Sequence, residues 1–369
     1  MESTTSFFCS RSGWHEGASD AILMATRLRS HPLASVHVWI PMSAVTIVIP
    51  HWNRRDLLEP LLKHLRSQSH PIEDVLVVDN GSDDESADHA ERLGARVLRL
   101  ERNFGFARAV NLGIQEVRTE YIAILNNDVQ PDTDWLRSLV IALGAHPEAW
   151  FATGKLYRAG QRETLDGTFD LLCRGACAWR AGHGRPDSAT WGQARQITSA
   201  PLTAVLFRRE LFERVGLLDE RFESYLEDVE FGVRCALSGH PGIYVPESIA
   251  AHAGSATLGA WHPETVRRLA RNQVLLIARH YPPGWWRSCG WAVLVAQVLW
   301  GAVALRHGAG WPWCRGKWEG IRQYALWRGG RWSDRDRWYR FLKEGEAEIR
   351  RLQTSSGYDQ FWRFYLALT

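Results

Sequence analysis

One polar cluster in the chain combines two amides and a carboxylate directly after an apolar strand. The run Asn126-Asn127-Asp128 follows the apolar residues 121–125, so its side chains are expected at the carboxyl edge of a sheet. A carboxylate there can hold a hard divalent cation, which completes its octahedral shell with substrate phosphate oxygens. A plainer interpretation stays open, in which Asp128 is a loop residue that caps the helix expected from about Asp132.

A second cluster places acidic residues at the start of a helix. Glu227 and Asp228 open the helix expected over 228–237, and the helix dipole favours carboxylates there, so simple capping is one interpretation. The other is general-base catalysis, in which a carboxylate takes the proton of an attacking hydroxyl. His252, at the end of an expected strand, is either a histidine satisfied in the core or a neutral imidazole that completes a metal site begun by Asp128.

Two further polar groups lie where strands give way to loops. Asp79 closes the strand expected over 74–78, and its carboxylate could accept hydrogen bonds from a pyrimidine N–H or a ribose hydroxyl. The sequence Asp-Asn-Gly-Ser is also ordinary turn chemistry, so a structural turn remains open. Asn103 precedes Gly105, a residue that permits close backbone approach to a ligand and equally suits a turn.

These polar clusters can form one site only if the fold brings the ends of their strands together. From residue 45 onward, strand-like and helix-like patterns alternate, and this repeated β-α order predicts an α/β protein with a doubly wound, mainly parallel sheet. In such a sheet, ligands bind at the carboxyl ends of the strands. The expected strands are 45–49, 74–78, 96–100, 121–125, 150–157, 204–207, 243–245 and 248–252, and the expected helices are 54–67, 82–93, 106–117, 132–145, 209–215 and 228–237.

Length and composition limit the classes of protein to which the chain can belong. The 369 residues suffice for one large or two ordinary domains, and a net charge of +3 gives no reason to expect a nucleic-acid partner. The six cysteines are scattered without paired metal spacing, which favours reduced thiols and a cytoplasmic location. We expect a poorly ordered N-terminal extension over 1–43 without a signal peptide, an α/β domain over 44–281, and a helical Trp/Arg-rich region over 282–369.

Tryptophan is the compositional oddity of the chain. Twelve of the 19 tryptophans lie at or beyond Trp261. Core packing is one explanation, but indole rings also concentrate at membrane–water interfaces. They flank the apolar run 291–305, which at about 15 residues is shorter than the ~20 needed to cross a bilayer. We therefore expect a helix that lies at a membrane surface, with peripheral contact to the inner face of the cell membrane.

Taken together, these motifs resemble glycosyltransferase family 2, the inverting enzymes of the GT-A fold, and most of all the rhamnosyltransferase-type branch of bacterial surface polysaccharide assembly. The resemblance covers residues 45 to about 281, and the ordered set is specific although each motif is weak alone. The matching pieces are Pro50-x-x-Asn53, Asp79-Asn80-x-Ser82, Asn103-x-Gly105-Phe106-Ala107, Asn111-x-Gly113, Asn126-Asn127-Asp128, Arg208-Arg209-Glu210, Gly216-x-Leu218-Asp219-Glu220-x-Phe222, and Tyr225-x-Glu227-Asp228-Val229-Glu230 with Arg234 and Gly239.

The resemblance implies roles for individual residues. Asp228 would be the general base and Glu227 its acidic neighbour near the acceptor, while Asp128 would contact Mg²⁺ or Mn²⁺ with His252 as a second metal contact. The residues implied to border or shape the nucleotide-sugar pocket are Pro50, Asn53, Asp79, Asn80, Asn103, Gly105, Asn111, Asn126 and Asn127. The family's Asp-x-Asp motif begins here with Asn126, which predicts a weaker metal site.

The implied activity is transfer of a sugar, with rhamnose as a candidate, from a dTDP- or UDP-type donor to a saccharide or lipid-linked acceptor. A rival of another class is a catalytically silent sugar-nucleotide-binding protein of the same fold, and the intact Asp128 and Asp228 favour the enzyme. A dinucleotide-dependent oxidoreductase would need Gly-x-Gly-x-x-Gly after the first strand, where Pro-His-Trp-Asn stands instead.

Overall fold

The central feature of the computed structural model is a ten-stranded sheet. The structure describes residues 43–254, 261–329 and 334–369. The prediction for residues 1–43 therefore lies, except for Ser43, outside the described residues. The strands of the sheet run in the order β10-β12-β6-β11-β4-β1-β2-β3, with β5 on β12 and β7 on β6. Their bounds are β1 Val45–His51, β2 Asp74–Asp79, β3 Arg96–Arg99, β4 Tyr121–Leu125, β5 Val129–Pro131, β6 Phe151–Arg158, β7 Gln161–Gly167, β10 Arg195–Ile197, β11 Ala204–Arg208 and β12 Gly242–His252.

The direction of the strands decides where their ends meet. Strands β1, β2, β3 and β4 are mutually parallel, as are β6 and β12, while β11 runs antiparallel between β4 and β6. The carboxyl ends of β1, β2, β4 and β12 consequently share one edge of the sheet. The α/β class and the mainly parallel, doubly wound sheet are confirmed. A separate two-stranded sheet pairs β8 (Asp170–Leu172) with β9 (Ala178–Arg180).

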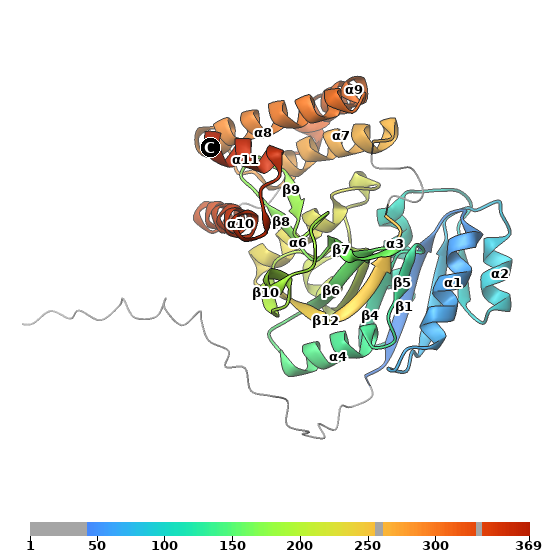
Figure 1. The fold of residues 1–369 in the computed structure, drawn as a ribbon. Helices are drawn as coiled ribbons and strands as arrows, with labels where there is room; N and C mark the ends of the chain where they lie inside the picture. The colour runs from blue at the N-terminus through green and yellow to red at the C-terminus, as the bar shows by residue number, and fades with distance from the viewer. Residues whose placement is uncertain (1–42, 255–260, 330–333) are drawn as a thin grey trace, which may run out of the picture. The chain divides into compact units, whose positions relative to one another are not determined.

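Helices cover both faces of the sheet (Figure 1). Side chains alternate along β1: Ile47 and Ile49 belong to a core with α1 and α4, whereas Val48 packs with α3 on the other face. Burial on both faces explains why β1 is apolar throughout. The helices are α1 Arg55–Arg66, α2 Ser86–Arg92, α3 Phe106–Gln115, α4 Trp135–Ala145, α5 Glu210–Val215, α6 Glu227–Ser238, α7 Pro263–His280, α8 Trp286–Arg306, α9 Gly310–Trp327, α10 Arg335–Ser356 and α11 Gln360–Leu368.

Two sequence predictions differ from the structure. The strands expected over 243–245 and 248–252 are one strand, β12, which pairs with β6 on both sides of an irregularity between Tyr244 and Ile249. Helix α2 begins at Ser86 and not at Ser82, because the Asp84 carboxylate accepts hydrogen bonds from the N–H of Ser86 and from that of Arg55, the first residue of α1. One carboxylate thus satisfies donors at the start of two helices.

The C-terminal helices share core side chains with the α/β part. Trp362 of α11 packs edge-on against Trp179 of β9, with ring centroids 6.4 Å apart. Leu342 of α10 is buried in a cluster with Leu172 of β8 and Val229 of α6. Residues 334–369 therefore help to hold β8, β9 and α6 in place.

Candidate active site

Three side chains from separate segments form a chain of contacts at the carboxyl end of β12. His252 Nε2 lies 3.2 Å from Asp128 Oδ1, and His252 Nδ1 lies 2.8 Å from Asp166 Oδ2. All three side chains are about nine-tenths buried. The predicted proximity of Asp128 and His252 is thus present, and Asp166 at the end of β7 is an additional partner.

The two carboxylates control the protonation of His252. Burial by itself lowers the pKa of His252, but the hydrogen bonds and charges of Asp128 and Asp166 outweigh it and raise the pKa to about 9. The imidazole is therefore protonated at neutral pH when no cation is bound. A cation at Nε2 would take the place of that proton, and Nδ1–H would still donate to Asp166, as metal-bound histidines commonly do to a carboxylate.

The two asparagines before Asp128 have different surroundings. Asn127 Nδ2 donates to His51 Nδ1 over 2.9 Å, and burial lowers the pKa of His51, so this imidazole is neutral with its proton on Nε2. That Nε2 and the Asn126 Oδ1 are both buried and without a hydrogen-bond partner among the described residues. Orphaned buried polar atoms are costly unless a ligand, an ion or water satisfies them, so both atoms indicate a binding site.

Asp228 sits in the first turn of α6 and is held by a guanidinium from β9. Arg180 Nη2 lies 3.4 Å from Asp228 Oδ2, and the same guanidinium pairs with buried Asp170 over 3.2 Å. Burial lowers the pKa of Arg180, but the neighbouring carboxylates of Asp170, Asp228 and Asp166 raise it, so the guanidinium stays charged. Asp166 also binds His252, so its charge acts on both clusters, although no hydrogen bond or ion pair joins it to Arg180 among the described residues.

Burial sets the proton affinities of the acidic pair on α6. Burial and the charge of Asp170 raise the pKa of Asp228 to about 6, against the lowering effect of Arg180. Burial and the charge of Asp228 raise the pKa of Glu227 well above its usual range. Asp228 is therefore mostly ionised at neutral pH yet basic enough to accept a proton, whereas Glu227 holds its proton more tightly than an exposed glutamic acid does. The Glu227 Oε2 has no hydrogen-bond partner in the part of the chain that the structure describes.

The residues predicted to border a nucleotide gather around the end of β2. Asp79 is buried, and no described residue hydrogen-bonds to its Oδ1. Asn80 Oδ1 accepts from the N–H of Phe104, and its Nδ2 donates to Asn103 Oδ1 over 3.1 Å. Asn80 therefore shapes the loop 103–105 and leaves the Asp79 carboxylate available to a ligand.

Pro50 lies near the end of β1, and Asn53 lies on the loop that follows. Pro50 pairs with Val78 within the sheet, and Asn53 adopts a left-handed backbone with φ 44°. Its N–H donates to Ser82 Oγ and its side-chain oxygen accepts from the N–H of Asp83. These bonds tie the loops after β1 and β2 together, which is how Asn53 contributes to the shape of this edge.

Asn111 has a role other than ligand contact. Its amide exchanges two hydrogen bonds of 2.9 Å with the backbone of Leu218, and its Nδ2 also donates to Glu220 Oε1. The buried side chain is thus occupied by the protein. It fixes α3 to the segment that precedes Asp228 and acts as a positioning residue, so any part that Asn111 has in shaping the pocket is indirect.

The loop 223–226, just before Asp228, is strained and firmly anchored. Glu223, Tyr225 and Leu226 all have positive φ, at 60°, 74° and 68°. Asn272 of α7 donates to three backbone carbonyls at the base of the loop, those of Phe222, Ser224 and Tyr225. Such backbone conformations persist only when the surroundings enforce them.

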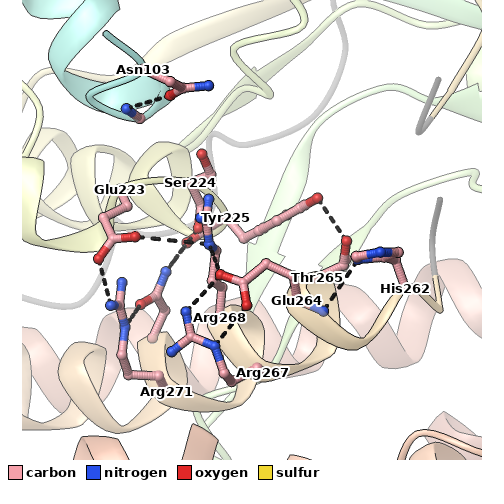
Figure 2. Close-up of polar contacts among 12 residues, drawn as sticks. Asn103, Glu223, Ser224, Tyr225, His262, Glu264, Thr265, Arg267, Arg268 and Arg271 are labelled. Atoms are coloured by element: carbon pink, nitrogen blue, oxygen red, sulfur yellow. Dashed lines mark hydrogen bonds and ion pairs between the residues drawn. The ribbon is translucent and has the colours of Figure 1, made fainter. Parts of the chain in front are cut away.

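Further contacts join this loop to its neighbours (Figure 2). Arg271 pairs with Glu223 over 2.6 Å, and the Tyr225 hydroxyl contacts Thr265. On the other side, Ala107 N–H donates to the Glu223 carbonyl, so the start of α3, which follows Gly105, rests on the loop. Gly105 has φ 89°, and a side chain there would come within 3.2 Å of the same carbonyl, so glycine is required.

Three residues of this site were not predicted: Asp166, Asp170 and Arg180. They lie in the segment 156–203, whose short strands show no clear periodicity. The available signal was the pair of aspartates four residues apart, Asp166-Gly-Thr-Phe-Asp170. His51, inside the predicted motif Pro50-x-x-Asn53, is a fourth addition.

The residues fit a divalent cation that arrives with a diphosphate. Asp128 and His252 offer one oxygen and one nitrogen within 3.2 Å of each other, and the orphaned Asn126 Oδ1 follows the same strand as Asp128. No group of three His, Cys, Asp or Glu side chains is placed to hold a metal among the described residues. A cation that takes most of its ligands from substrate phosphates needs only one or two from the protein.

The site thus combines a buried carboxylate at the start of α6, an Asp–His pair and orphaned polar atoms around the strand ends of a mixed α/β sheet. Residues 46–216 match the family model described as glycosyl transferase family 2. The chain therefore contains a domain of this family and is a glycosyltransferase. The matched range includes Asp79 and Asp128 and ends before Asp228 and His252.

Relatives and solved structures agree with this assignment. The chain is 28% identical over 296 residues to N-acetylglucosaminyl-diphospho-decaprenol L-rhamnosyltransferase of Mycobacterium tuberculosis, covering 72% of this chain and 91% of that protein. It is 29% identical over 229 residues to the O-antigen biosynthesis protein RfbC of Myxococcus xanthus, covering 58% of this chain but only 17% of that protein. The crystal structure of GalNAc-T7 with UDP, GalNAc and Mn²⁺ shares the fold with a TM-score of 0.57 at 14% identity, covering 85% of this chain and 57% of that one.

Proposed function

We propose that this glycosyltransferase moves a sugar, with rhamnose as the candidate, from a dTDP- or UDP-linked donor to a saccharide or lipid-linked saccharide acceptor in bacterial surface polysaccharide synthesis, with inversion at the anomeric carbon. The observation that carries the proposal is the buried Asp228 carboxylate, held by Arg180, together with the buried Asp128–His252 pair. The first provides a proton acceptor and the second a site for a diphosphate-bound cation.

Asp228 supplies the base in this mechanism. Its pKa of about 6 lets it take the proton as the acceptor hydroxyl attacks the anomeric carbon. A single displacement, with the sugar–phosphate bond breaking on the opposite face, inverts the configuration. Arg180 orients the carboxylate and offsets part of the cost of its burial, while the anchored loop 223–226 fixes the start of α6.

The donor side relies on the loops after β1, β2 and β4. Asp79 offers a carboxylate oxygen to a base or ribose, and His51 Nε2 offers a donor. Asp128 and His252 would hold Mg²⁺ or Mn²⁺, and the cation when bound supplies charge stabilisation for the departing diphosphate. The presence of Mn²⁺ and UDP in the related GalNAc-T7 structure supports this proposal, because that protein has the same fold.

The named relative supports the proposed acceptor and donor. The mycobacterial enzyme is named for transfer of L-rhamnose to a sugar on a diphospho-decaprenol lipid, which supports a deoxysugar donor and a lipid-linked acceptor here. Residues 156–203, which contribute Asp166, Asp170 and Arg180, are the part of the site that we expect to select the acceptor.

A donor panel tests the proposal. The purified protein is incubated without acceptor with dTDP-rhamnose, UDP-glucose, UDP-N-acetylglucosamine and GDP-mannose, and slow release of the nucleoside diphosphate is followed. We expect one dTDP- or UDP-sugar to be hydrolysed well above the others. With a synthetic lipid-diphosphate saccharide added, the anomeric proton coupling of the product should show inversion. Release of nucleotide from no donor, or a product with retained configuration, would contradict the proposal.

A further inference from the structure

Helix α8 is apolar around its whole circumference. It spans 21 residues, Trp286–Arg306, contains an 18-residue stretch with a mean hydropathy of 1.7, and is the one helix among the described residues long and apolar enough to cross a membrane by length and composition. The apolar run 291–305 identified in the sequence lies within this helix, which begins earlier, at Trp286.

The inner side of α8 is packed on the glycosyltransferase domain. Ala292, Val295 and Ala296 belong to the core that contains Trp179 and Cys177. The Gln297 amide donates to the Gly175 carbonyl over 3.0 Å, and a side chain at Gly175 would meet the Ala296 methyl at 2.5 Å. A helix bound to its own domain along its length lies on that domain, so we treat α8 as a surface element and not as a span.

The outer side of α8 carries a continuous apolar stripe. Exposed residues recur every three or four positions at Trp291, Leu294, Val298, Ala302 and Leu305, which places them on one face. Leu294, Val298 and Leu305 are 54%, 60% and 71% exposed. Contiguous exposed apolar surface of this kind is unusual on a soluble protein and marks a surface that binds a partner or a membrane.

Two neighbouring helices continue the stripe. At one end, the Trp291 indole donates to the carbonyl of Leu368, the exposed last residue of α11. At the other end, a side chain added at Gly310, the first residue of α9, would meet Leu305 at 3.0 Å, and exposed Trp311 follows Gly310. Figure 1 shows α8, α9 and α11 gathered in the same part of the fold, beside α7. We call the set Trp291, Leu294, Val298, Leu305, Trp311 and Leu368 the apolar face.

The charges on these three helices are almost all positive. Helices α8, α9 and α11 carry five arginines and one acid, Glu319, while Lys317 donates to Gln273 and burial lowers its pKa to about 7. Glu319 is already paired with Arg267 and Arg315. Arg322 lies over the ring of exposed Trp318, an arrangement of cation and indole that suits the boundary between headgroups and acyl chains.

We propose that the apolar face docks on a lipid bilayer that carries anionic headgroups, with α8 lying along the surface. Apolar side chains enter the acyl boundary while the surrounding arginines contact lipid phosphates. The inference goes beyond sugar transfer and does not depend on it, because it concerns a surface outside the active site. Charge complementarity selects this occupant over a second copy of the chain, whose equal positive charge would oppose such a contact.

Vesicle co-sedimentation tests the proposal. The full chain is mixed with vesicles of phosphatidylcholine alone, or with roughly one part in four of phosphatidylglycerol, at low and high salt. Binding should require the anionic lipid and should weaken with salt. The variant L294Q/V298Q/L305Q should bind at least about tenfold more weakly, since three apolar side chains no longer leave water. These side chains are exposed, so circular dichroism and donor hydrolysis should be unchanged.

The matched control is I141Q, which changes an exposed isoleucine on α4 in the same way. It should bind vesicles like the wild type. Equal vesicle binding by the triple variant and the wild type would overturn the proposal. So would the finding that the wild type is a dimer and the triple variant a monomer while both bind vesicles equally, since the apolar face would then join two copies of the chain. If the triple variant lost vesicle binding but still hydrolysed the donor, this would support docking of the apolar face on the bilayer, whatever the outcome for the proposed activity.

Discussion

Arg180 reaches from β9 to the proposed proton acceptor on α6: its Nη2 lies 3.4 Å from Asp228 Oδ2 while the same guanidinium pairs with Asp170. One cation therefore lies between two buried carboxylates. The Asp228 proton affinity is set by the balance of burial and Asp170, which raise it, against Arg180, which lowers it.

Replacement of Asp228 tests its role as base. Asp228→Asn keeps size and burial but cannot accept the proton of the acceptor hydroxyl, so turnover should fall by about 100-fold or more while donor affinity is retained. Steady-state transfer and calorimetric binding of the nucleoside diphosphate measure the two effects. The exposed Asp336→Asn serves as control, and a D228N enzyme within a few-fold of wild type would remove Asp228 from this role.

The pH profile should report the same carboxyl group. A general base works only when ionised, so the rate should be level above the raised pKa of about 6 and should fall as pH drops through it. Asp170→Asn removes a negative neighbour and should move the acid limb to lower pH. Arg180→Met removes the cation and should move it to higher pH, each by about one unit. If both variants moved the acid limb in the same direction, the assignment of this limb to Asp228 would be refuted. Opposite shifts would support it, because a purely structural disturbance gives no reason for the two variants to differ in sign.

Metal dependence should rest on Asp128. Asp128→Ala should abolish stimulation by Mg²⁺ or Mn²⁺ and weaken binding of the nucleoside diphosphate, because cation and diphosphate bind as one unit. Calorimetry with and without EDTA separates these effects. Asp132→Ala, at a more exposed aspartate paired with Arg162, should behave like wild type. Full transfer by EDTA-treated wild-type enzyme would show that the metal proposal is wrong for this protein.

Asn272 should stabilise the fold through the strained loop. Its amide serves three backbone carbonyls, and Asn272→Ala leaves these buried groups unsatisfied beside residues with positive φ. We expect the free energy of unfolding to fall by about 2–3 kcal/mol. Urea denaturation measures this change, with the exposed Gln115→Ala as control. An unchanged unfolding midpoint would mean that the loop holds its conformation without this anchor.

Local periodicity in the sequence determined most of the α/β scaffold. The strand 121–125 was predicted to the residue, and the predicted boundaries of α1, α5 and α6 differ from the observed ones by one residue at most at each end, because continuous apolar runs and helical spacing are properties of neighbouring residues. The positions of Asp79, Asn126 and Asp128 after strands followed from the same reasoning, and parallel strands then had to bring them to one edge.

Tertiary structure decided what those residues touch. Asp166, Asp170 and Arg180 come from a segment without periodic pattern, and only the packing of β7, β8 and β9 brings them to His252 and Asp228. Asn111 shows the converse: its motif pointed to a ligand, yet its partners Leu218 and Glu220 lie more than a hundred residues away and occupy its amide. Burial, which raises the pKa of Asp228, and exposure, which defines the outer stripe of α8, depend on contacts between distant segments, so no local pattern could have determined them.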